Sequence, residues 1–410
     1  MNLYDPQRLR ELAREFQTPL WCYDASVIRG RVEQLRSFDT VRYAQKANAN
    51  THLLRLLKDL GVWVDAVSLG EIERAVRAGY SNADGEAQIV YTSDVLDEAT
   101  IARVIELNIP VNAGSPQMLE QIGRANPGHP IWLRINPGFG HGHSRKTNTG
   151  GEHSKHGNWH ENLSHCYALI EKYKLRLIGL HMHIGSGVDY EHLQRVATTM
   201  VEQVLRCPFD IEAISAGGGL PVVYRESDRE IDLGQYFAIW DQARKRIEAH
   251  LRHPVSLELE PGRLLVAEAG CLITQVRASK DVGRNHFVLV NAGFNDLLRP
   301  AMYGAYHQAT VIPQDAHTPP RQPRPTVVAG ALCEAGDVFT QSADGQLEQR
   351  LLLPVEVDDL IVFHACGAYG SSMSSNYNSR PLAAEVLLDG DRVRLIRRRQ
   401  TIEELLQLEE

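Results

Sequence analysis

Short β-branched runs alternate with longer amphipathic stretches between residues 41 and 262, and this alternation restricts the fold more than any other feature of the sequence. Eight runs can be counted: Val41–Lys46, Val62–Ser68, Ile89–Ser93, Pro110–Ser115, Ile131–Pro137, Leu177–Gly185, Ala213–Gly219 and Val255–Gly262. Between them lie helical candidates such as THLLRLLKDLG, LGEIERAVRAG and EHLQRVATTMVEQVLR. Eight strands with intervening helices in about 250 residues predict an α/β fold, a (β/α)8 TIM barrel.

After Gly262 the pattern changes to strand-like alternation without long helices, as in CLITQVRAS, HFVLVNAG and AAEVLLDGDRVRLIRR. This part predicts a C-terminal all-β domain, barrel- or sandwich-like. The proline-rich segment VIPQDAHTPPRQPRPT is expected to be a surface loop, and TIEELLQLEE a short terminal helix.

Composition and charge exclude several classes of protein. The net charge is −8 with the acidic residues spread along the chain, which argues against nucleic acid as a partner. No uncharged apolar run approaches the roughly 18 residues needed to cross a membrane, and the first residues lack a hydrophobic signal core, so a cytoplasmic protein is expected. The six cysteines lie far apart with no CxxC pair, so neither a disulfide framework nor a zinc knuckle is indicated.

Polar residues fall at the carboxyl ends of the predicted strands, where a barrel carries its catalytic groups. They are Lys46, Asp65 and Ser68, Arg134 and Asn136, His181 and His183, Gly217–Gly219, and Glu260 with Arg263. Packing alone is a poor explanation for reactive side chains gathered at one end of so many strands.

Three of these positions have both a functional and a structural interpretation. Lys46 in the barrel mouth could form a Schiff base, or it could be a solvated surface charge. Gly217–Gly219 could let backbone N–H groups approach a phosphate, or form a tight turn. Glu260 could pair with a protonated heterocycle, or with an arginine in a structural ion pair.

The histidines raise the question of a metal site, because His181 and His183 share one face of a strand and HGH occurs at His141–His143. No HExxH-like acidic pattern accompanies them, so no metal is expected. We interpret His181 as a core histidine bonded to a backbone carbonyl, and His183 as a flat partner stacked on an aromatic cofactor. An imine-forming lysine, a glycine-rich phosphate loop, a carboxylate and a stacking imidazole together are what pyridoxal 5'-phosphate requires.

Motifs in this order and spacing resemble those of the diaminopimelate decarboxylases, a family of alanine-racemase-like, fold-type III pyridoxal-phosphate enzymes. They are YAQKAN, RINPGFGHGHSRKTNTGGEHSKHG, HMHIGSG, SAGGGLP, EPGR, NDLLRPAMY, LCEAGD and GAYGSSMSSNYNSRP. The resemblance covers nearly the whole chain. It implies decarboxylation of meso-2,6-diaminopimelate to L-lysine and CO2, the last step of lysine biosynthesis.

The resemblance also implies a role for each matching residue. The cofactor would be held by Lys46, His183, Ser186, Gly217, Gly218, Gly219, Glu260, Pro261, Gly262, Arg263 and Tyr369. Arg263, Arg299 and Tyr303 would bind a substrate carboxylate, and Glu334 would bind an ammonium group. Tyr369 would also contact the substrate. Cys333 would be the acid that reprotonates the carbon.

The assembly implied is a homodimer with shared active sites, in which Cys333 and Glu334 enter from the partner. We accordingly expect a barrel domain at residues 27–263 that binds the cofactor, and a β domain at 264–410 with 1–26 that contributes to the partner's site.

The chain departs from the family pattern near the proposed site, with Ala331, Ala335, Ala365 and Asn291 at positions usually occupied by proline, serine, aspartate and aspartate. Alternatives are a related decarboxylase acting on ornithine, lysine or a carrier-linked amino acid, a racemase, and a non-catalytic cofactor-binding paralogue. Retention of Arg299 and Tyr303 disfavours the first, since those substrates lack a distal carboxylate. Retention of Lys46 and Cys333 disfavours the last.

Overall fold

The computed structural model describes residues 3–140, 149–183, 185, 187, 189–315 and 322–409. Contacts divide the chain into two compact units. The barrel unit comprises residues 31–221 and 229–264, and the β unit comprises residues 1–30, 222–228 and 265–410. The segment 222–228, which the sequence pattern assigns to the barrel domain, therefore clusters with the β unit.

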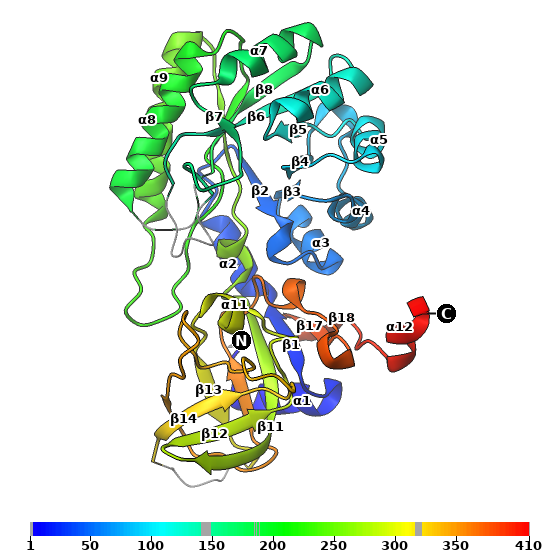
Figure 1. Cartoon of the computed structure of the whole chain (residues 1–410), viewed down its shortest axis with the longest axis vertical. Helices are drawn as coiled ribbons and strands as arrows, with labels where there is room; N and C mark the ends of the chain where they lie inside the picture. The colour runs from blue at the N-terminus through cyan, green and yellow to red at the C-terminus, as the bar shows by residue number, and fades with distance from the viewer. Residues whose placement is uncertain are drawn as a thin grey trace. The chain divides into compact units, whose positions relative to one another are not determined.

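The barrel unit contains a closed ring of parallel strands, and this confirms the TIM barrel prediction (Figure 1). Around the ring they are β2 (Thr40–Ala44), β3 (Trp63–Ala66), β4 (Ile89–Ser93), β5 (Val111–Ala113), β6 (Pro130–Asn136), β8 (Arg176–His181), β9 (Ala213–Ser215) and β10 (Ser256–Leu259). Pairing of β5 with β6 and of β10 with β2 closes the ring. A two-residue strand, β7 (Asn158–Trp159), adds to β6. Each strand lies within one residue of a predicted run, and most end before the run does.

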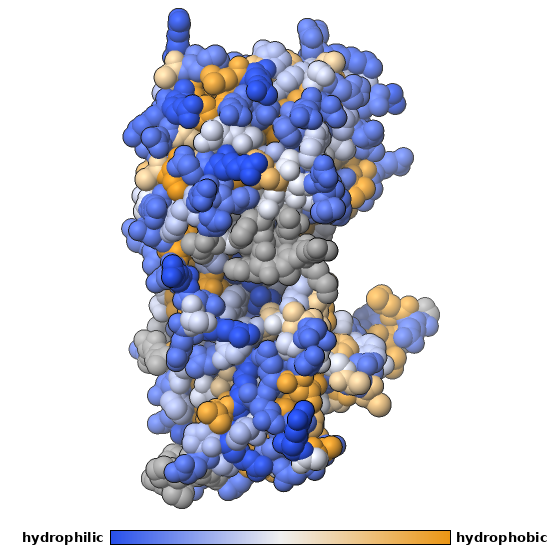
Figure 2. All heavy atoms as spheres, turned by 60° about the vertical axis from the view of Figure 1, so that its left-hand side comes forward, coloured by the Kyte–Doolittle hydropathy of each residue, from blue (hydrophilic) through white to orange (hydrophobic). Residues whose placement is uncertain are grey.

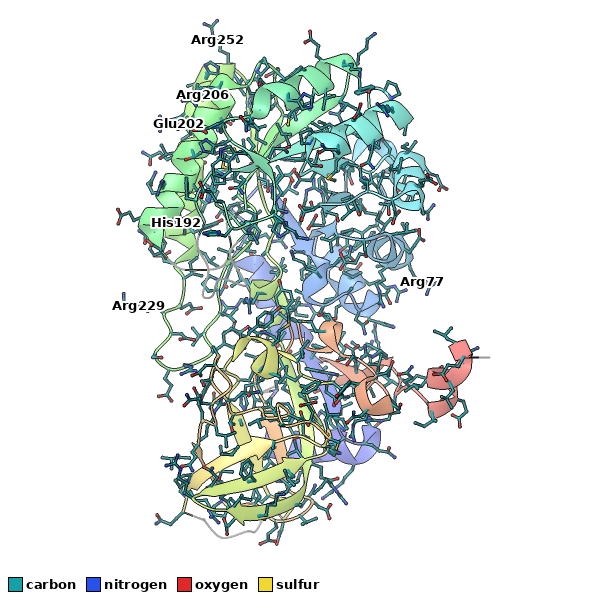
Figure 3. The ribbon with its side chains drawn as sticks, viewed as in Figure 1. Arg77, His192, Glu202, Arg206, Arg229 and Arg252 are labelled. Atoms are coloured by element: carbon teal, nitrogen blue, oxygen red, sulfur yellow. The ribbon has the colours of Figure 1, made fainter. Side chains whose placement is uncertain are left out.

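Helices cover the outside of the barrel and follow the expected apolar periodicity (Figure 1). They are α3 (Thr51–Asp59), α4 (Leu69–Ala78), α5 (Glu98–Glu106), α6 (Pro116–Ala125), α7 (Leu163–Lys172), α8 (Tyr190–Arg206) and α9 (Leu233–Leu251). Helix α8 buries Met200 and Val204 and exposes Glu202 and Arg206, which Figure 3 labels. Its N-cap Asp189 accepts hydrogen bonds from the first turn, so a polar residue fixes where the helix begins.

The β unit is built on a mixed sheet whose central strand comes from the start of the chain. Strand β1 (Leu20–Asp24) pairs antiparallel with β11 (Gly270–Val282) and parallel with β17 (Ala384–Asp389). The other strands are β12 (Asn285–Val290), β13 (Ala309–Ile312), β14 (Arg324–Ala329), β15 (Arg350–Leu352), β16 (Leu360–Phe363) and β18 (Arg392–Arg397). Leucine, isoleucine and valine side chains of β1, β11, β13, β16 and β17 form one buried cluster together with Leu9 and Leu12 of α1 (Pro6–Phe16).

Short helices complete both units. Helix α2 (Ala25–Glu33) crosses the division between them, α10 (Arg263–Val266) follows β10, and α11 (Arg299–Tyr303) follows β12. The predicted terminal helix is α12 (Ile402–Leu406), which begins with a capping box between Thr401 and Glu404. The predicted loop at 311–326 is shorter than expected, because residues 311–312 belong to β13 and residues 324–326 to β14. Its residues 316–321 lie outside the described ranges.

The surface is mostly hydrophilic on the face that Figure 2 shows, with hydrophobic atoms on the C-terminal segment around α12. The residues concerned include Ile402, Leu406 and Leu408, which are exposed. Within the described residues, none of the helices has the length and apolar character needed to span a membrane.

Candidate active site

Lys46 follows the first barrel strand and its side chain is exposed, whereas its neighbours Gln45 and Ala47 are buried. The three residues form a 3-10 turn, η1 (Gln45–Ala47), directly after β2. The Lys46 charge acts on two carboxyl groups of the barrel unit, Asp65 and Glu71, where it opposes a rise in pKa caused mainly by burial. The amine therefore lies in the electrostatic field of the polar groups at this end of the barrel.

Glu260 follows β10 and is the most strongly stabilised carboxylate at this end of the barrel. Its two oxygens accept hydrogen bonds from His181 Nε2 at 2.8 Å and from Ser215 Oγ at 2.9 Å. Burial opposes ionisation of Glu260, but the His181 charge and these hydrogen bonds outweigh burial and lower its pKa to about 2. Glu260 is therefore ionised at neutral pH although only 9% of its surface is exposed.

The predicted hydrogen-bond partner of His181 is wrong. His181 is a buried core histidine as expected, but its Nε2 bonds to the Glu260 carboxylate and not to a backbone carbonyl. The reason lies in the ring of strands, because β8, β9 and β10 are consecutive neighbours whose carboxyl ends carry His181, Ser215 and Glu260 together.

His183 is half-buried and lies against the glycine triplet 217–219. Its Nδ1 accepts a hydrogen bond from the Gly218 N–H at 3.2 Å. Burial, together with the positive charges of Arg134 and Lys46, holds the pKa of His183 well below its ordinary value. The imidazole is therefore neutral at neutral pH, with its proton on Nε2.

The triplet requires glycine because the surrounding backbone leaves no room for side chains. A Cβ at Gly217 would lie 2.5 Å from the Met182 carbonyl oxygen, one at Gly218 2.3 Å from the Glu260 carbonyl oxygen, and one at Gly219 2.0 Å from the Gly185 carbonyl oxygen. Gly217 and Gly219 also have positive φ angles of 63° and 94°. The triplet therefore forms a tight turn, as one of the two interpretations predicts.

The turn Glu260–Arg263 packs against the lysine turn. The Ala44 N–H donates to the Pro261 carbonyl oxygen at 3.1 Å, and a Cβ on Gly262 would lie 3.2 Å from the Cβ of Ala47. Arg263 begins α10 and is half-buried. These contacts bring the lysine turn and the Glu260 turn side by side in the barrel unit.

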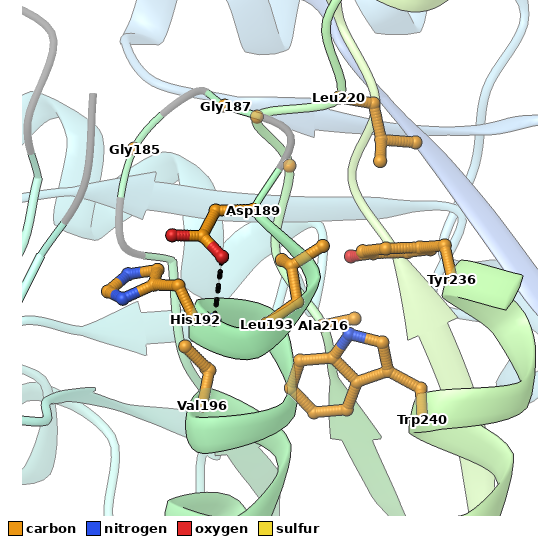
Figure 4. A pocket seen from close by; sticks show the side chains of 12 residues that line it. Gly185, Gly187, Asp189, His192, Leu193, Val196, Ala216, Leu220, Tyr236 and Trp240 are labelled. Atoms are coloured by element: carbon orange, nitrogen blue, oxygen red, sulfur yellow. Dashed lines mark hydrogen bonds between the residues drawn. The ribbon is translucent and has the colours of Figure 1, made fainter. Parts of the chain in front are cut away.

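A small pocket lies beside the glycine triplet (Figure 4). Gly218, Gly219 and Leu220 line one part, and side chains of α8 and α9 such as Leu193, Tyr236 and Trp240 line the rest. Figure 4 shows the hydrogen bond that the Asp189 carboxylate accepts from the His192 N–H at the start of α8, at the edge of this pocket. The space therefore adjoins the backbone that the sequence predicts to hold a phosphate.

Several polar atoms near the carboxyl ends of the strands are buried without a hydrogen-bond partner among the described residues. They are Asp65 Oδ1, Asn112 Oδ1, His181 Nδ1, and both amide atoms of Gln45. Burial and the charge of Glu260 also raise the pKa of Asp65 well above its ordinary value. Buried polar groups normally have partners, so this end of the barrel is suited to a polar ligand.

Ser186 and His141–His143 lie outside the described residues. Among the residues that are described, no cluster of three or more histidine, cysteine, aspartate or glutamate side chains has the arrangement of a metal site.

The other predicted site residues belong to the β unit. Arg299 begins α11 and is buried, and Tyr303 ends the same helix and is half-buried. Cys333 and Glu334 are exposed on the turn after β14. Tyr369 is half-buried with a φ of 57°, in the left-handed region that non-glycine residues rarely adopt.

Hydrogen bonds fix the turn that carries Cys333 and Glu334. The Cys333 N–H donates to Asn378 Oδ1 at 2.9 Å, and Tyr377 Oη donates to Glu334 Oε2 at 3.3 Å. The Asp337 carboxylate accepts the N–H groups of Leu332 and Phe294, each at 2.7 Å. Asp337 is not among the site residues predicted from the sequence, although it is the last residue of the LCEAGD motif.

The atypical residues near the site have different surroundings. Asn291 is structural, since its side chain accepts from the Gln275 N–H and donates to Thr18 Oγ1. Ala335 is exposed and donates its N–H to Glu334 Oε1 at 3.0 Å. Ala365 has a φ of 52°, where aspartate is easier to accommodate than alanine.

Known proteins with the same architecture were found by sequence and by structure. The sequence profile of the family described as "Pyridoxal-dependent decarboxylase, pyridoxal binding domain" matches residues 26–267. The diaminopimelate decarboxylase of Streptomyces coelicolor is 60% identical over 402 residues, which cover 98% of this chain and 91% of that protein.

A crystal structure of a diaminopimelate decarboxylase matches with a TM-score of 0.96 at 56% identity, covering 98% of this chain and 96% of the other. The diaminopimelate decarboxylase of Helicobacter pylori, crystallised in complex with L-lysine, matches with a TM-score of 0.85 at 33% identity, covering 97% and 98% of the two chains. The chain therefore belongs to the diaminopimelate decarboxylases, pyridoxal-dependent carboxy-lyases, as the sequence motifs predict.

Proposed function

We propose that this chain catalyses the pyridoxal-phosphate-dependent decarboxylation of meso-2,6-diaminopimelate to L-lysine and CO2. The observation that carries the proposal is the group at the barrel mouth: an exposed lysine, a buried ionised glutamate and a neutral half-buried histidine, in a chain 60% identical to a diaminopimelate decarboxylase.

The residues at the carboxyl ends of the strands fit pyridoxal phosphate. Lys46 offers an accessible primary amine, and Glu260 keeps its negative charge at neutral pH for a protonated pyridine nitrogen. His183 is a flat, uncharged ring suited to stacking. The backbone around Gly217–Gly219, which would reject a Cβ, adjoins a cavity, and a phosphate would lie there with support from Ser186 and the turn Pro261–Arg263.

When bound, pyridoxal phosphate supplies an electron sink for the carbon that loses its carboxylate. Lys46 would hold the cofactor and yield its place to the substrate amine, while Tyr369 would contact both cofactor and substrate. Glu260, fixed by His181 and Ser215, would hold a proton at the ring nitrogen. Cys333 would donate a proton to the carbon from which CO2 has left, and solvent would restore the thiol.

Substrate selection would depend on the two ends of diaminopimelate. Arg263, Arg299 and Tyr303 would bind the distal carboxylate, and Glu334 the distal ammonium. Ornithine lacks that carboxylate, so the same residues disfavour a shifted decarboxylase. A racemase would need two opposed bases and no exit for a carboxylate, and a non-catalytic paralogue has no need of an acid such as Cys333.

The test is to incubate the purified protein with meso-diaminopimelate, ornithine, lysine and arginine and to measure CO2 release. Release from meso-diaminopimelate with stoichiometric L-lysine supports the proposal. Release from another amino acid at a higher kcat/KM would contradict it, and release from none would favour the non-catalytic alternative.

We further propose that the protein acts as a cytoplasmic homodimer in which Cys333 and Glu334 complete the partner's site. Both side chains are exposed on the single chain, which supports a role toward another molecule. The net charge of −8 supports the absence of nucleic acid as a partner.

A further inference from the structure

The guanidinium group of Arg299 is held by two side chains that sequence reasoning did not identify. Arg299 is 7% exposed, and its Nη1 donates to Tyr224 Oη at 3.1 Å and to His307 Nε2 at 2.9 Å. Both hydrogens of Nη1 are therefore used within the β unit. In the described part of the chain, Nε and Nη2 have no hydrogen-bond partner, which leaves that edge of the fork for a carboxylate.

The bonding around His307 defines its protonation state. Arginine has no acceptor, so His307 Nε2 must accept from Arg299 and carries no proton. His307 Nδ1 lies 2.9 Å from the His364 carbonyl oxygen, which can only accept, so Nδ1 carries the proton. His307 is 1% exposed and is thus a buried neutral acceptor aimed at the arginine.

Tyr224 adds a second constraint on the same group. Arg299 Cζ lies 5.0 Å from the centre of the Tyr224 ring, and this ring meets His307 edge to face at 5.5 Å. Tyr224 comes from the segment 222–228, which clusters with the β unit although it interrupts the barrel sequence. The hydrogen bond from Arg299 to Tyr224 is one contact that joins this segment to the β unit.

The surroundings of Arg299 are cationic. Arg225 and Arg350 stack on Tyr306 with Cζ atoms 4.5 and 4.0 Å from the ring centre, and Arg350 Nη1 donates to the His307 carbonyl oxygen. No carboxylate oxygen of the described residues forms an ion pair with Arg225, Arg299 or Arg350. Three guanidinium groups without an acidic partner favour an anion as the missing component.

We propose that Tyr224 and His307 are positioning residues that hold Arg299 free of acidic partners, and that they set the enzyme's preference for substrates with a distal carboxylate. The inference rests on the proposed function, because it takes Arg299 as the group that binds this carboxylate. A neutral acceptor at position 307 orients the arginine without neutralising it, whereas a glutamate there would occupy the edge that the substrate needs.

The first experiment compares steady-state kinetics of the holoenzyme with meso-diaminopimelate. Tyr224→Phe removes the hydroxyl and keeps the ring, His307→Phe removes the acceptor, and His307→Gln keeps a neutral acceptor. We expect KM to rise about ten-fold in Tyr224→Phe and His307→Phe with kcat nearly unchanged, and His307→Gln to restore most of the loss. Tyr306→Phe is the matched control, since it keeps the stacked ring and does not touch Arg299.

The second experiment separates the carboxylate from the rest of the ligand. L-Lysine keeps the carboxylate that Arg299 would bind, and 1,5-diaminopentane is the same molecule without it. We expect Tyr224→Phe to weaken L-lysine binding to the holoenzyme about ten-fold by calorimetry and to leave 1,5-diaminopentane binding unchanged. Tyr224→Phe also keeps the test decisive if the His307 variants fail to fold.

Arg299→Met separates the proposed role of Arg299 in substrate binding from the positioning roles of Tyr224 and His307. If it leaves KM and L-lysine affinity unchanged, the proposed role of Arg299 in substrate binding is wrong. Arg299→Met is compared with the other variants in the same assays. If Arg299→Met raises KM and weakens L-lysine binding while Tyr224→Phe and His307→Phe behave like the Tyr306→Phe control, only the positioning role is wrong. The positioning role would also be refuted if Tyr224→Phe lowered the affinity for L-lysine and for 1,5-diaminopentane equally, or if His307→Gln had the same raised KM as His307→Phe.

Discussion

Replacing Glu260 with glutamine tests the electrostatics of the barrel mouth without any ligand. The Glu260 pKa of about 2 lies below its ordinary value of 4.5, and at about 1.4 kcal/mol per pKa unit this difference corresponds to about 3 kcal/mol of preference for the charged form. Glutamine resembles the neutral acid in shape. We therefore expect Glu260→Gln to lower the free energy of unfolding by about 3 kcal/mol at pH 7.

The stabilising effect of Glu260 depends on pH. Because folding lowers the pKa of Glu260, its stabilising effect is complete above pH 4.5 and is lost as the pH falls toward 2. The difference between wild type and variant should thus stay constant from pH 8 to 5.5 and shrink by about 1 kcal/mol at pH 4.

The assay is urea unfolding of the cofactor-free proteins, followed by the fluorescence of the buried barrel tryptophans Trp132 and Trp240. Glu212→Gln is the control, since it breaks an exposed pair with Arg176 and should cost less than about 1 kcal/mol. A variant as stable as wild type at pH 7, or a difference that does not change at pH 4, would refute the account of His181 and Ser215 stabilising this carboxylate.

Three other outcomes follow from the proposed site and assembly. Borohydride should fix pyridoxal phosphate onto Lys46, and a Lys46→Ala protein that still forms the reduced adduct would contradict the assignment. Glu334→Gln should lower kcat/KM for meso-diaminopimelate roughly ten- to hundred-fold, because the distal ammonium loses a charged partner; unchanged kcat/KM would remove Glu334 from the site. Inactive Lys46→Ala and Cys333→Ala proteins, mixed under conditions that exchange subunits, should recover about a quarter of wild-type activity, because about half of the dimers are mixed and each mixed dimer has one intact site. If a mass tag shows exchange and activity stays at the sum of the parents, sites are not shared between subunits.

The barrel was predictable because each of its strands and helices has a recognisable residue pattern within its own short stretch of sequence. Each barrel strand contains valine, isoleucine or leucine, and these short segments recur at the spacing of βα units. The role of β1 was not predictable in the same way. Its sequence LWCYD has the composition of a strand, but nothing near it reveals pairing with Gly270–Val282 and Ala384–Asp389.

The site was predictable where it depends on position along a strand. Lys46 and Glu260 follow barrel strands, so their place at the mouth could be read from the pattern. The partner of His181 could not, because a contact between the ends of β8 and β10 depends on the closed ring. Tyr224 and His307 were missed for a similar reason, since their relation to Arg299 exists only in the folded β unit.

The central position of β1 has a consequence for synthesis on the ribosome. The strand leaves the ribosome before both of its sheet neighbours, which begin at Gly270 and Ala384. The barrel can therefore close while β1 still has both edges unpaired, and an unpaired strand is a template for aggregation. A nascent chain that stalls before β17 would carry this open edge, so synthesis of Ala384–Asp389 is the step that covers β1.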